Sequence, residues 1–137
     1  MKNRILIVDD SESWLMFHKT LINELYGDLF EIITANSAQE AYDIVRQNIN
    51  NPFNLVITDM QMELIFEDIE AGEWLIQRIK ELSKYYACKI VIISGMYNIQ
   101  KIAEKYNVDC ISKNILVHNK LLLKFMFEKL MPFLTKI

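Results

Sequence analysis

Five polar side chains stand at the ends of four short apolar runs in the sequence. They are Asp9 and Asp10 after residues 5–8, Asp59 after residues 55–58, Ser94 after residues 90–93, and Lys113 after residues 110–112. Short apolar runs of this kind are typical of parallel strands that are buried on both faces. Ligands of an open parallel sheet bind beyond the carboxyl ends of its strands. We therefore expect the five side chains to meet in one site.

The three aspartates form a ligand set for a small, hard cation. Carboxylates that converge repel one another unless a cation neutralises them. Mg²⁺ suits the set, because it takes one or two carboxylates, keeps waters and leaves positions for phosphate oxygens. His18 and His118 belong to no cluster of metal ligands, which argues against zinc.

The same groups could carry out phosphoryl transfer to a carboxylate. A carboxylate beside bound Mg²⁺ can act as a nucleophile on phosphorus and form an acyl phosphate. The cation and an ammonium group would hold the equatorial oxygens of the transferring group. Lys113 supplies the ammonium, and the Ser94 hydroxyl can donate a hydrogen bond to the same oxygens. The sequence therefore contains every part that phosphoryl transfer to an aspartate requires.

The elements that must position these groups alternate between strands and helices. The predicted strands are residues 5–8, 30–35, 55–58, 90–93 and 110–112. The predicted helices begin after Ser11, after Ser37, near Leu75, after Asn98 and near Asn119, and the last runs to about Leu130. Ser37 and Glu40 are expected to form a capping box. Five strand–helix units predict an α/β protein with a doubly wound parallel sheet.

Length and charge narrow the class of protein. The chain of 137 residues fits a single domain, residues 1–137, with a substantial core. Its net charge of −3 gives no general attraction for nucleic acid. No apolar stretch is long enough to cross a bilayer, so we expect a cytoplasmic protein.

In these features the sequence resembles the response-regulator receiver domains of two-component signalling, the CheY-like superfamily. The matching features are Asp9-Asp10 after the first strand, Thr58-Asp59-Met60 at the third, Ser94-Gly95 at the fourth and Ser112-Lys113 at the fifth. The resemblance covers essentially the whole chain. It implies a flavodoxin-like (βα)5 three-layer sandwich with parallel sheet order 2-1-3-4-5.

The resemblance also implies a role for each residue of the site. Asp59 would be the phosphoacceptor, and Asp10 and Asp59 would ligate Mg²⁺ directly. Asp9 would act largely through a bound water, and the backbone carbonyl of Gln61 would complete the protein ligands. Ser94 and Lys113 would contact the phosphoryl group and report its arrival.

The expected function is that of a phosphoacceptor in a phosphorelay, with self-catalysed phosphoryl transfer and slow autodephosphorylation rather than metabolic turnover. Its partners would be a histidine kinase or phosphotransfer protein and a downstream protein target, without direct contact to nucleic acid or membrane. The alternative is an adaptor that binds a protein partner constitutively, without phosphorylation. The complete set of site residues favours the phosphoacceptor, whereas departures from the family pattern keep the adaptor open.

The segment after Asp59 departs most from that pattern. The family places a proline and a glycine shortly after the phosphoacceptor, but here the first glycine after Asp59 is at position 72, and no proline lies between the two. The loop at about 62–72 is therefore extended, and it is acidic. One interpretation is a solvated extension with Leu64, Ile65 and Phe66 packed on the sheet edge. The other is a lid or docking element beside Asp59.

The output side of the family pattern is altered as well. Cys110 stands where the family has an aromatic residue whose rotamer follows phosphorylation, so the usual readout is in doubt. Asn114 stands where the family has a proline in cis, which leaves this peptide bond trans or strained.

The final helix, two histidines and two tryptophans are assigned from their residue types. The final helix is apolar beyond a single stripe, which indicates either a broad buried face or a partner or dimer surface, and we favour the surface. His18 and His118 are expected at the surface or its boundary. Trp14 and Trp74 are expected to be packing residues.

Overall fold

The short apolar runs form the five strands of one parallel sheet. The strands are β1 (Asn3–Val8), β2 (Phe30–Ala35), β3 (Leu55–Thr58), β4 (Lys89–Ser94) and β5 (Asp109–Ser112). Their order is β2-β1-β3-β4-β5, and every neighbouring pair is parallel. The structure is a computed structural model that describes residues 2–65 and 68–136. It confirms the predicted doubly wound sheet and its strand order.

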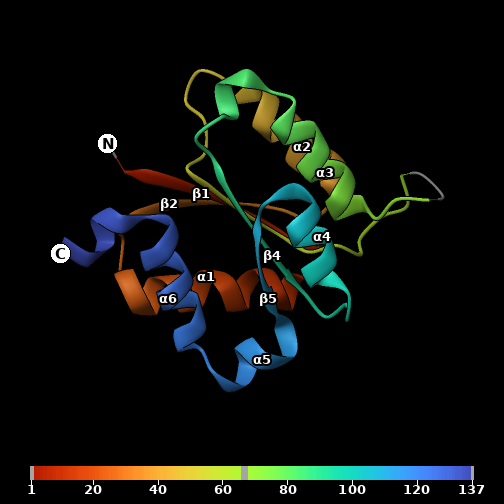
Figure 1. Ribbon diagram of the computed structural model, residues 1–137. Coiled ribbons are helices and arrows are strands. Elements are labelled where there is room, and N and C mark those ends of the chain that lie inside the picture. Colours follow the sequence, from red (N-terminus) through yellow and green to blue (C-terminus); the bar gives the residue numbers. More distant parts are fainter. Residues whose placement is uncertain (1, 66–67, 137) are drawn as a thin grey trace.

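Helices cover both faces of this sheet (Figure 1). They are α1 (Glu12–Tyr26), α2 (Ala38–Gln47), α3 (Ala71–Lys80), α4 (Ile99–Tyr106), α5 (Lys113–His118) and α6 (Leu121–Leu130), with short 3-10 turns η1 (Ser83–Tyr85) and η2 (Pro132–Lys136). Ile5 and Ile7 of β1 belong to the core with α1 and α6, whereas Leu6 and Val8 belong to the core with α2, α3 and α4. Because successive side chains alternate between two buried faces, the strands read as continuous apolar runs.

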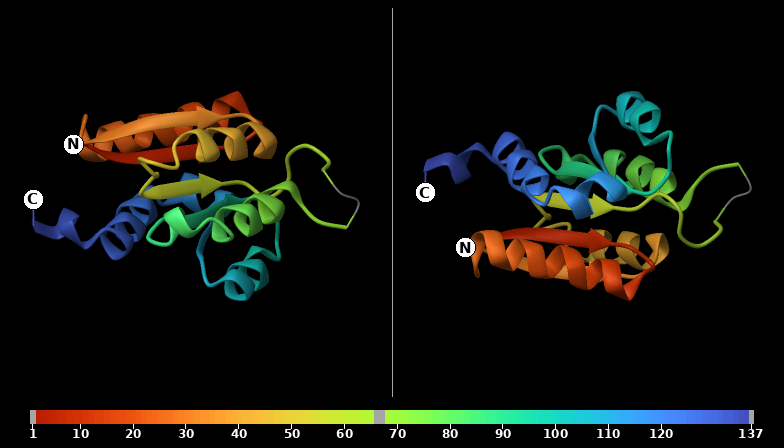
Figure 2. Two further views of the ribbon diagram at one scale, coloured as in Figure 1. Left: turned by 90° about the horizontal axis from the view of Figure 1, so that it is seen from above. Right: turned by 90° about the horizontal axis from the view of Figure 1, so that it is seen from below.

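The strands end together at one edge of the sheet. In Figure 2 the arrows of β1, β2 and β3 point toward residues 61–65 and 68–70, which project beyond the strand ends. The two ends of the described chain lie at the opposite end of the molecule (Figure 1). This arrangement brings the residues that follow β1, β3, β4 and β5 to a common edge, as the sequence predicts.

Helix caps fix the turns at this edge. The Ser11 hydroxyl accepts a hydrogen bond from the Trp14 amide at 3.4 Å, at the start of α1. The Ser37 hydroxyl accepts one from the Glu40 amide at 3.0 Å, at the start of α2. The Glu40 carboxylate bonds back to the Asn36 amide at 3.1 Å, so the predicted capping box closes one residue earlier than expected.

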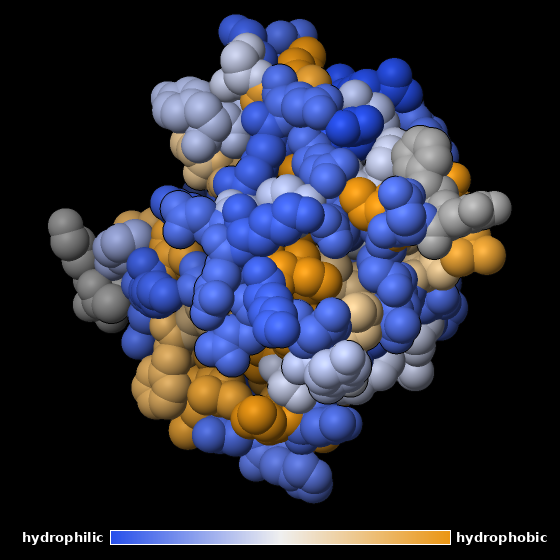
Figure 3. Space-filling model, turned by 45° about the vertical axis from the view of Figure 1, so that its right-hand side comes forward, coloured by the Kyte–Doolittle hydropathy of each residue, from blue (hydrophilic) through white to orange (hydrophobic). Residues whose placement is uncertain are grey.

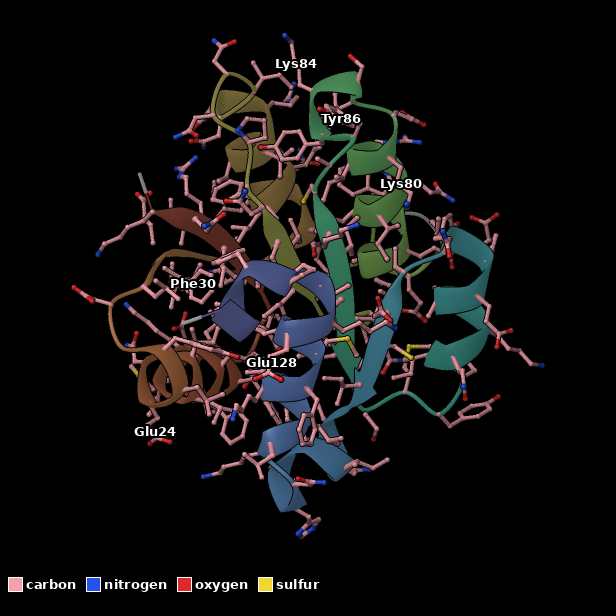
Figure 4. All side chains as sticks on the ribbon, turned by 60° about the vertical axis from the view of Figure 1, so that its left-hand side comes forward. Glu24, Phe30, Lys80, Lys84, Tyr86 and Glu128 are labelled. Atoms are coloured by element: carbon pink, nitrogen blue, oxygen red, sulfur yellow. The ribbon has the colours of Figure 1, made fainter. Side chains whose placement is uncertain are left out.

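An aromatic cluster joins α1 and α6 beneath the sheet. The ring of Tyr26 stacks on Phe127 with centroids 5.6 Å apart, and Phe30 meets Phe127 edge-on at 5.7 Å. Phe30 lies between the two helices in Figure 4, whereas Glu24 of α1 points away from the sheet. These contacts hold α1 against the sheet. The first turn of α1 borders the site.

The sequence did not predict α5. Its first residue is Lys113, directly after β5, and Leu116 anchors it with a fully buried side chain. Among the described residues no peptide bond is cis, so the Lys113–Asn114 bond is trans and the chain can turn into a helix at once. Six residues are too few for a helical period to show in the sequence.

The predicted cap of α4 is correct only in position. Asn98 occupies the N-cap, but its side chain makes no capping hydrogen bond, and its Oδ1 atom has no partner among the described residues.

Of the helices that the structure describes, none combines the length and the apolar character needed to cross a bilayer.

Candidate functional site

Asp59 lies at the centre of the strand edge, directly after β3. Its backbone amide donates to the Val8 carbonyl at 3.0 Å, which continues the pairing of β1 and β3 by one residue. Its side chain is 8 % exposed. The Met60 amide donates to its Oδ1 atom at 2.7 Å and fixes the orientation of the carboxylate. One buried carboxylate oxygen, Oδ2, is thereby directed at the other groups of the site.

Asp9 and Asp10 reach the same place from the end of β1. The carboxylate of Asp9 is fully buried, and its Oδ1 atom accepts a hydrogen bond from the Ser11 amide at 2.9 Å. Asp10 is exposed to solvent. One carboxylate oxygen from each of Asp9, Asp10 and Asp59 lies within 4.8 Å of the others. The predicted convergence of the three aspartates is therefore present.

Lys113 bridges the two buried carboxylates. Its Nζ atom is 2.9 Å from Oδ2 of Asp9 and 2.8 Å from Oδ2 of Asp59. Burial works against the ammonium charge, but the two carboxylates outweigh it and raise the pKa of Lys113 above its ordinary value. Lys113 therefore stays positively charged at neutral pH. For Asp9, burial raises the pKa by more than the contact with Lys113 lowers it.

The site fits a divalent cation. Three carboxylates lie beside a single ammonium, so acidic groups outnumber the basic group within the cluster. Oδ2 of Asp9 is buried and accepts no well-aligned hydrogen bond from the described residues, although Lys113 lies at ion-pair distance. Exposed Asp10 keeps one side of the cluster open to water, as a partly hydrated Mg²⁺ requires.

Ser94 and Gln61 are the two remaining residues that the sequence assigns to the site. The Ser94 hydroxyl is buried at the end of β4 and accepts a hydrogen bond from the Met96 amide at 3.2 Å. Its own hydrogen is not used in that bond. Gln61 follows Met60 on the loop that leaves Asp59, and it is exposed. The role of its backbone carbonyl as a ligand stays a prediction.

The start of α3 packs directly on the backbone of Asp59. The Gly72 amide donates to the Met60 carbonyl at 2.9 Å. A Cβ atom at position 72 would lie 2.0 Å from the Asp59 carbonyl oxygen and 2.7 Å from Cα of Met60. The sequence shows that a glycine follows the acidic loop, but only the structure shows that the backbone contact at Asp59 requires it.

The comparisons with known proteins agree with this geometry. The model of the response regulator receiver domain family matches residues 5–124. The chain belongs to this family. Receiver domains are signalling domains rather than metabolic enzymes, interact with histidine kinases and downstream effectors, and generally bind Mg²⁺ at an acidic pocket. A comparison with curated proteins gives no match.

Solved receiver domains share the fold over nearly the whole chain. A CheY-like receiver domain protein from Methanospirillum hungatei JF-1 is 25 % identical, with a TM-score of 0.68, and the match covers 95 % of this chain and 94 % of that one. A receiver domain protein from Clostridium thermocellum is 26 % identical, with a TM-score of 0.65 and coverage of 88 % and 98 %. The phosphorylated cyanobacterial phytochrome response regulator RcpA is similar in fold, with 18 % identity, a TM-score of 0.75 and coverage of 93 % of each chain.

Two aromatic residues of α1 border the site of this receiver domain. Nζ of Lys113 lies over the Trp14 ring, 4.8 Å from its centroid. The Trp14 ring is 5.5 Å from the ring of His18, one turn further along the helix. Trp14 was predicted to be a packing residue, but it also contacts the ammonium group of the site. Trp74, by contrast, is buried against Tyr42, as expected.

The prediction that His18 lies at the surface was wrong. Its side chain is 1 % exposed, and burial lowers its pKa to about 4, with a smaller contribution from the charge of Lys113. The signal was present in the sequence, because His18 stands in the same helical stripe as Leu21, Ile22 and Leu25. His118, on α5, is exposed as predicted.

The acidic loop is attached to α2 at its beginning. The Glu63 carboxylate accepts hydrogen bonds from the amides of Ala38 and Gln39, both at 2.9 Å. Leu64 is 95 % exposed, so it does not pack on the sheet edge as one interpretation expected. Ile65 does contact the core, and Phe66 lies outside the described residues. The loop therefore has a fixed first part and a projecting apolar side chain next to it.

We expect Glu63→Gln to lower the free energy of unfolding by about 1 kcal/mol, because a carboxylate at a helix N-terminus interacts with the dipole and with free amides. The loss is measured by urea unfolding at low ionic strength. Hydrogen exchange at the amides of Ala38 and Gln39 should become faster. Glu70→Gln is the matched control, since Glu70 makes no side-chain capping bond at the start of α3. Equal losses for the two variants would contradict the assignment.

Proposed function

We propose that this receiver domain accepts a phosphoryl group on Asp59 from a histidine kinase or a phosphotransfer protein, and that the modification alters its binding to a downstream protein. The observation that carries the proposal is the oriented, buried Asp59 carboxylate beside Lys113 and the two aspartates of β1. An Asp59 oxygen would attack phosphorus as the bond between phosphorus and the donor breaks, and the donor would leave with that electron pair.

Asp9, Asp10, Asp59 and the backbone carbonyl of Gln61 would hold Mg²⁺ in this reaction. The bound ion would neutralise the carboxylates and the oxygens of the incoming phosphoryl group. Lys113 already carries its charge at the correct edge and would bind one phosphoryl oxygen. Ser94 would donate its hydroxyl hydrogen to another, which its present bond from Met96 leaves available.

The downstream protein is proposed to bind at α5 and α6. The exposed apolar side chains here are Ile115, Val117, Leu121 and Phe125. Figure 3 shows hydrophobic residues gathered at the lower left of the molecule, over these helices. A groove of about 310 Å³ beside them is lined by Cys110, Ile111, Phe125 and neighbouring residues. Leu123 and Phe127 fill the core instead, so α6 has both a buried and an exposed apolar face. Homodimerisation through the exposed face is a second use of it.

We also propose that residues 1–137 form one cytoplasmic domain with the acidic loop at about 62–72 as an extension. The match of the family over residues 5–124 supports this assignment. The constitutive adaptor is not favoured, since an adaptor needs neither the buried Asp59 carboxylate nor the ammonium group that bridges it.

The test is incubation with Mg²⁺ and a small acyl phosphate, followed by intact-mass measurement. The wild-type protein should gain one phosphoryl group, and Asp59→Asn should gain none. Removal of Mg²⁺ by a chelator should abolish the gain. Asp68→Asn is the matched control, because Asp68 is an exposed aspartate on the acidic loop. A folded wild-type protein that gains no mass at saturating donor would contradict the proposal and support the adaptor.

A further inference from the structure

Three groups surround the Lys113 ammonium in the described part of the chain. Two are the carboxylates of Asp9 and Asp59, at 2.9 and 2.8 Å. The third is the indole of Trp14, whose ring centroid is 4.8 Å from Nζ. The face of an indole carries partial negative charge and attracts a cation within about 6 Å of the centroid. The indole therefore attracts the ammonium without being a charged group.

The Trp14 ring is itself held in place from α1. Phe17 meets it edge-on with centroids 5.0 Å apart, and His18 lies 5.5 Å from it. His18 is buried, and its pKa of about 4 leaves the imidazole neutral at neutral pH. No second positive charge therefore competes with Lys113 at the ring from this side. Trp14 lies in the first turn of α1, and its amide donates to the Ser11 hydroxyl that caps this turn, which fixes its backbone.

The carboxylates and the indole respond differently to Mg²⁺. A cation held among the three aspartates would neutralise the oxygens that Lys113 now bridges, and it would repel the ammonium. The indole is unaffected, because it is not a ligand for a hard cation. With Mg²⁺ bound, the strongest fixed attraction for Lys113 among its present contacts is therefore the face of Trp14.

We propose that Trp14 is a positioning residue that keeps the Lys113 ammonium at the site once the carboxylates are occupied, ready to bind the incoming phosphoryl group. This inference rests on the proposed function of Asp59 as phosphoacceptor. Trp14 touches neither the reacting oxygen nor the phosphorus. It acts through Lys113, so its contribution should depend on an aromatic face and not on side-chain volume alone.

The first test compares two substitutions that both reduce the size of the side chain at position 14. Trp14→Leu should slow phosphorylation by a small acyl phosphate about fivefold, which corresponds to a cation–π attraction of about 1 kcal/mol. Trp14→Phe retains an aromatic face and should stay within about twofold of the wild-type rate. Equal rates for the two variants would overturn the proposal, because Trp14 would then contribute only through packing.

The second test needs neither phosphorylation nor a change at Trp14. In a Trp74→Phe background, Trp14 is the single tryptophan, and Lys113→Met should change its emission because the ammonium leaves the ring. Lys101→Met is the matched control, since Lys101 is exposed on α4. The difference between the Lys113 and Lys113→Met proteins should persist in saturating Mg²⁺.

The two tests separate this inference from the proposed function. Loss of the emission difference on adding Mg²⁺ would overturn the inference, since Lys113 would then leave the ring when it is needed. A wild-type protein that takes up no phosphoryl group would contradict the role of Asp59, and an emission difference that persists would still establish the contact between Lys113 and Trp14.

Discussion

Gly72→Ala is expected to lower the free energy of unfolding by roughly 3 kcal/mol, the upper part of the usual range for overpacking. The new Cβ would lie 2.0 Å from the Asp59 carbonyl oxygen and 2.7 Å from Cα of Met60. Both are backbone atoms, which cannot move aside as the end of a flexible side chain can. Either α3 or the turn after β3 must shift, and the second movement would displace the phosphoacceptor.

The loss is measured by urea unfolding, with the rate of phosphorylation as a second readout. Gly95→Ala is the matched control, because a Cβ at position 95 meets nothing within 4 Å and the backbone there is not left-handed. We expect that control to change stability by less than about 0.5 kcal/mol. A Gly72→Ala protein as stable as the control would contradict the close contact between α3 and Asp59.

Acidification is expected to destabilise the domain by about 3 kcal/mol through His18. Its pKa is about 4 in the folded protein and 6.5 in a model peptide, so the unfolded chain takes up the proton first. The stability that His18 contributes is therefore complete above pH 6.5 and is lost as the pH falls toward 4. At about 1.4 kcal/mol for each pH unit of this interval, the loss comes to about 3 kcal/mol.

The experiment compares unfolding free energies between pH 7 and pH 4 for the wild type and for His18→Leu. The variant should lose about 3 kcal/mol less than the wild type over this range. His118→Leu is the control and should follow the wild type, since His118 is exposed. Asp9 acts in the opposite direction, because its raised pKa lets the folded state take up a proton before the unfolded chain does. Parallel curves for the wild type and His18→Leu would refute the buried, neutral His18.

The composition of the reactive edge followed from the sequence. Asp9, Asp10, Asp59, Ser94 and Lys113 each end a run whose apolar character reports burial on both faces of a parallel sheet. Parallel strands that enter one sheet must end at the same edge, so residues far apart in the chain could be placed together from local patterns alone. The capped starts of α1 and α2 were readable for the same reason, because a cap is a contact between near neighbours.

The tertiary structure alone decided which side chains complete that edge. The contacts of Trp14 with Lys113, of Glu63 with α2 and of Gly72 with the Asp59 backbone join segments of different elements. Such contacts depend on how a helix is rotated and how a loop returns. Residue periodicity limits the buried face of a helix but does not give the distance between two side chains across the fold. The charged residues of the site could therefore be predicted from the sequence. The side chains and backbone groups that hold them in position could not, because those contacts depend on tertiary packing.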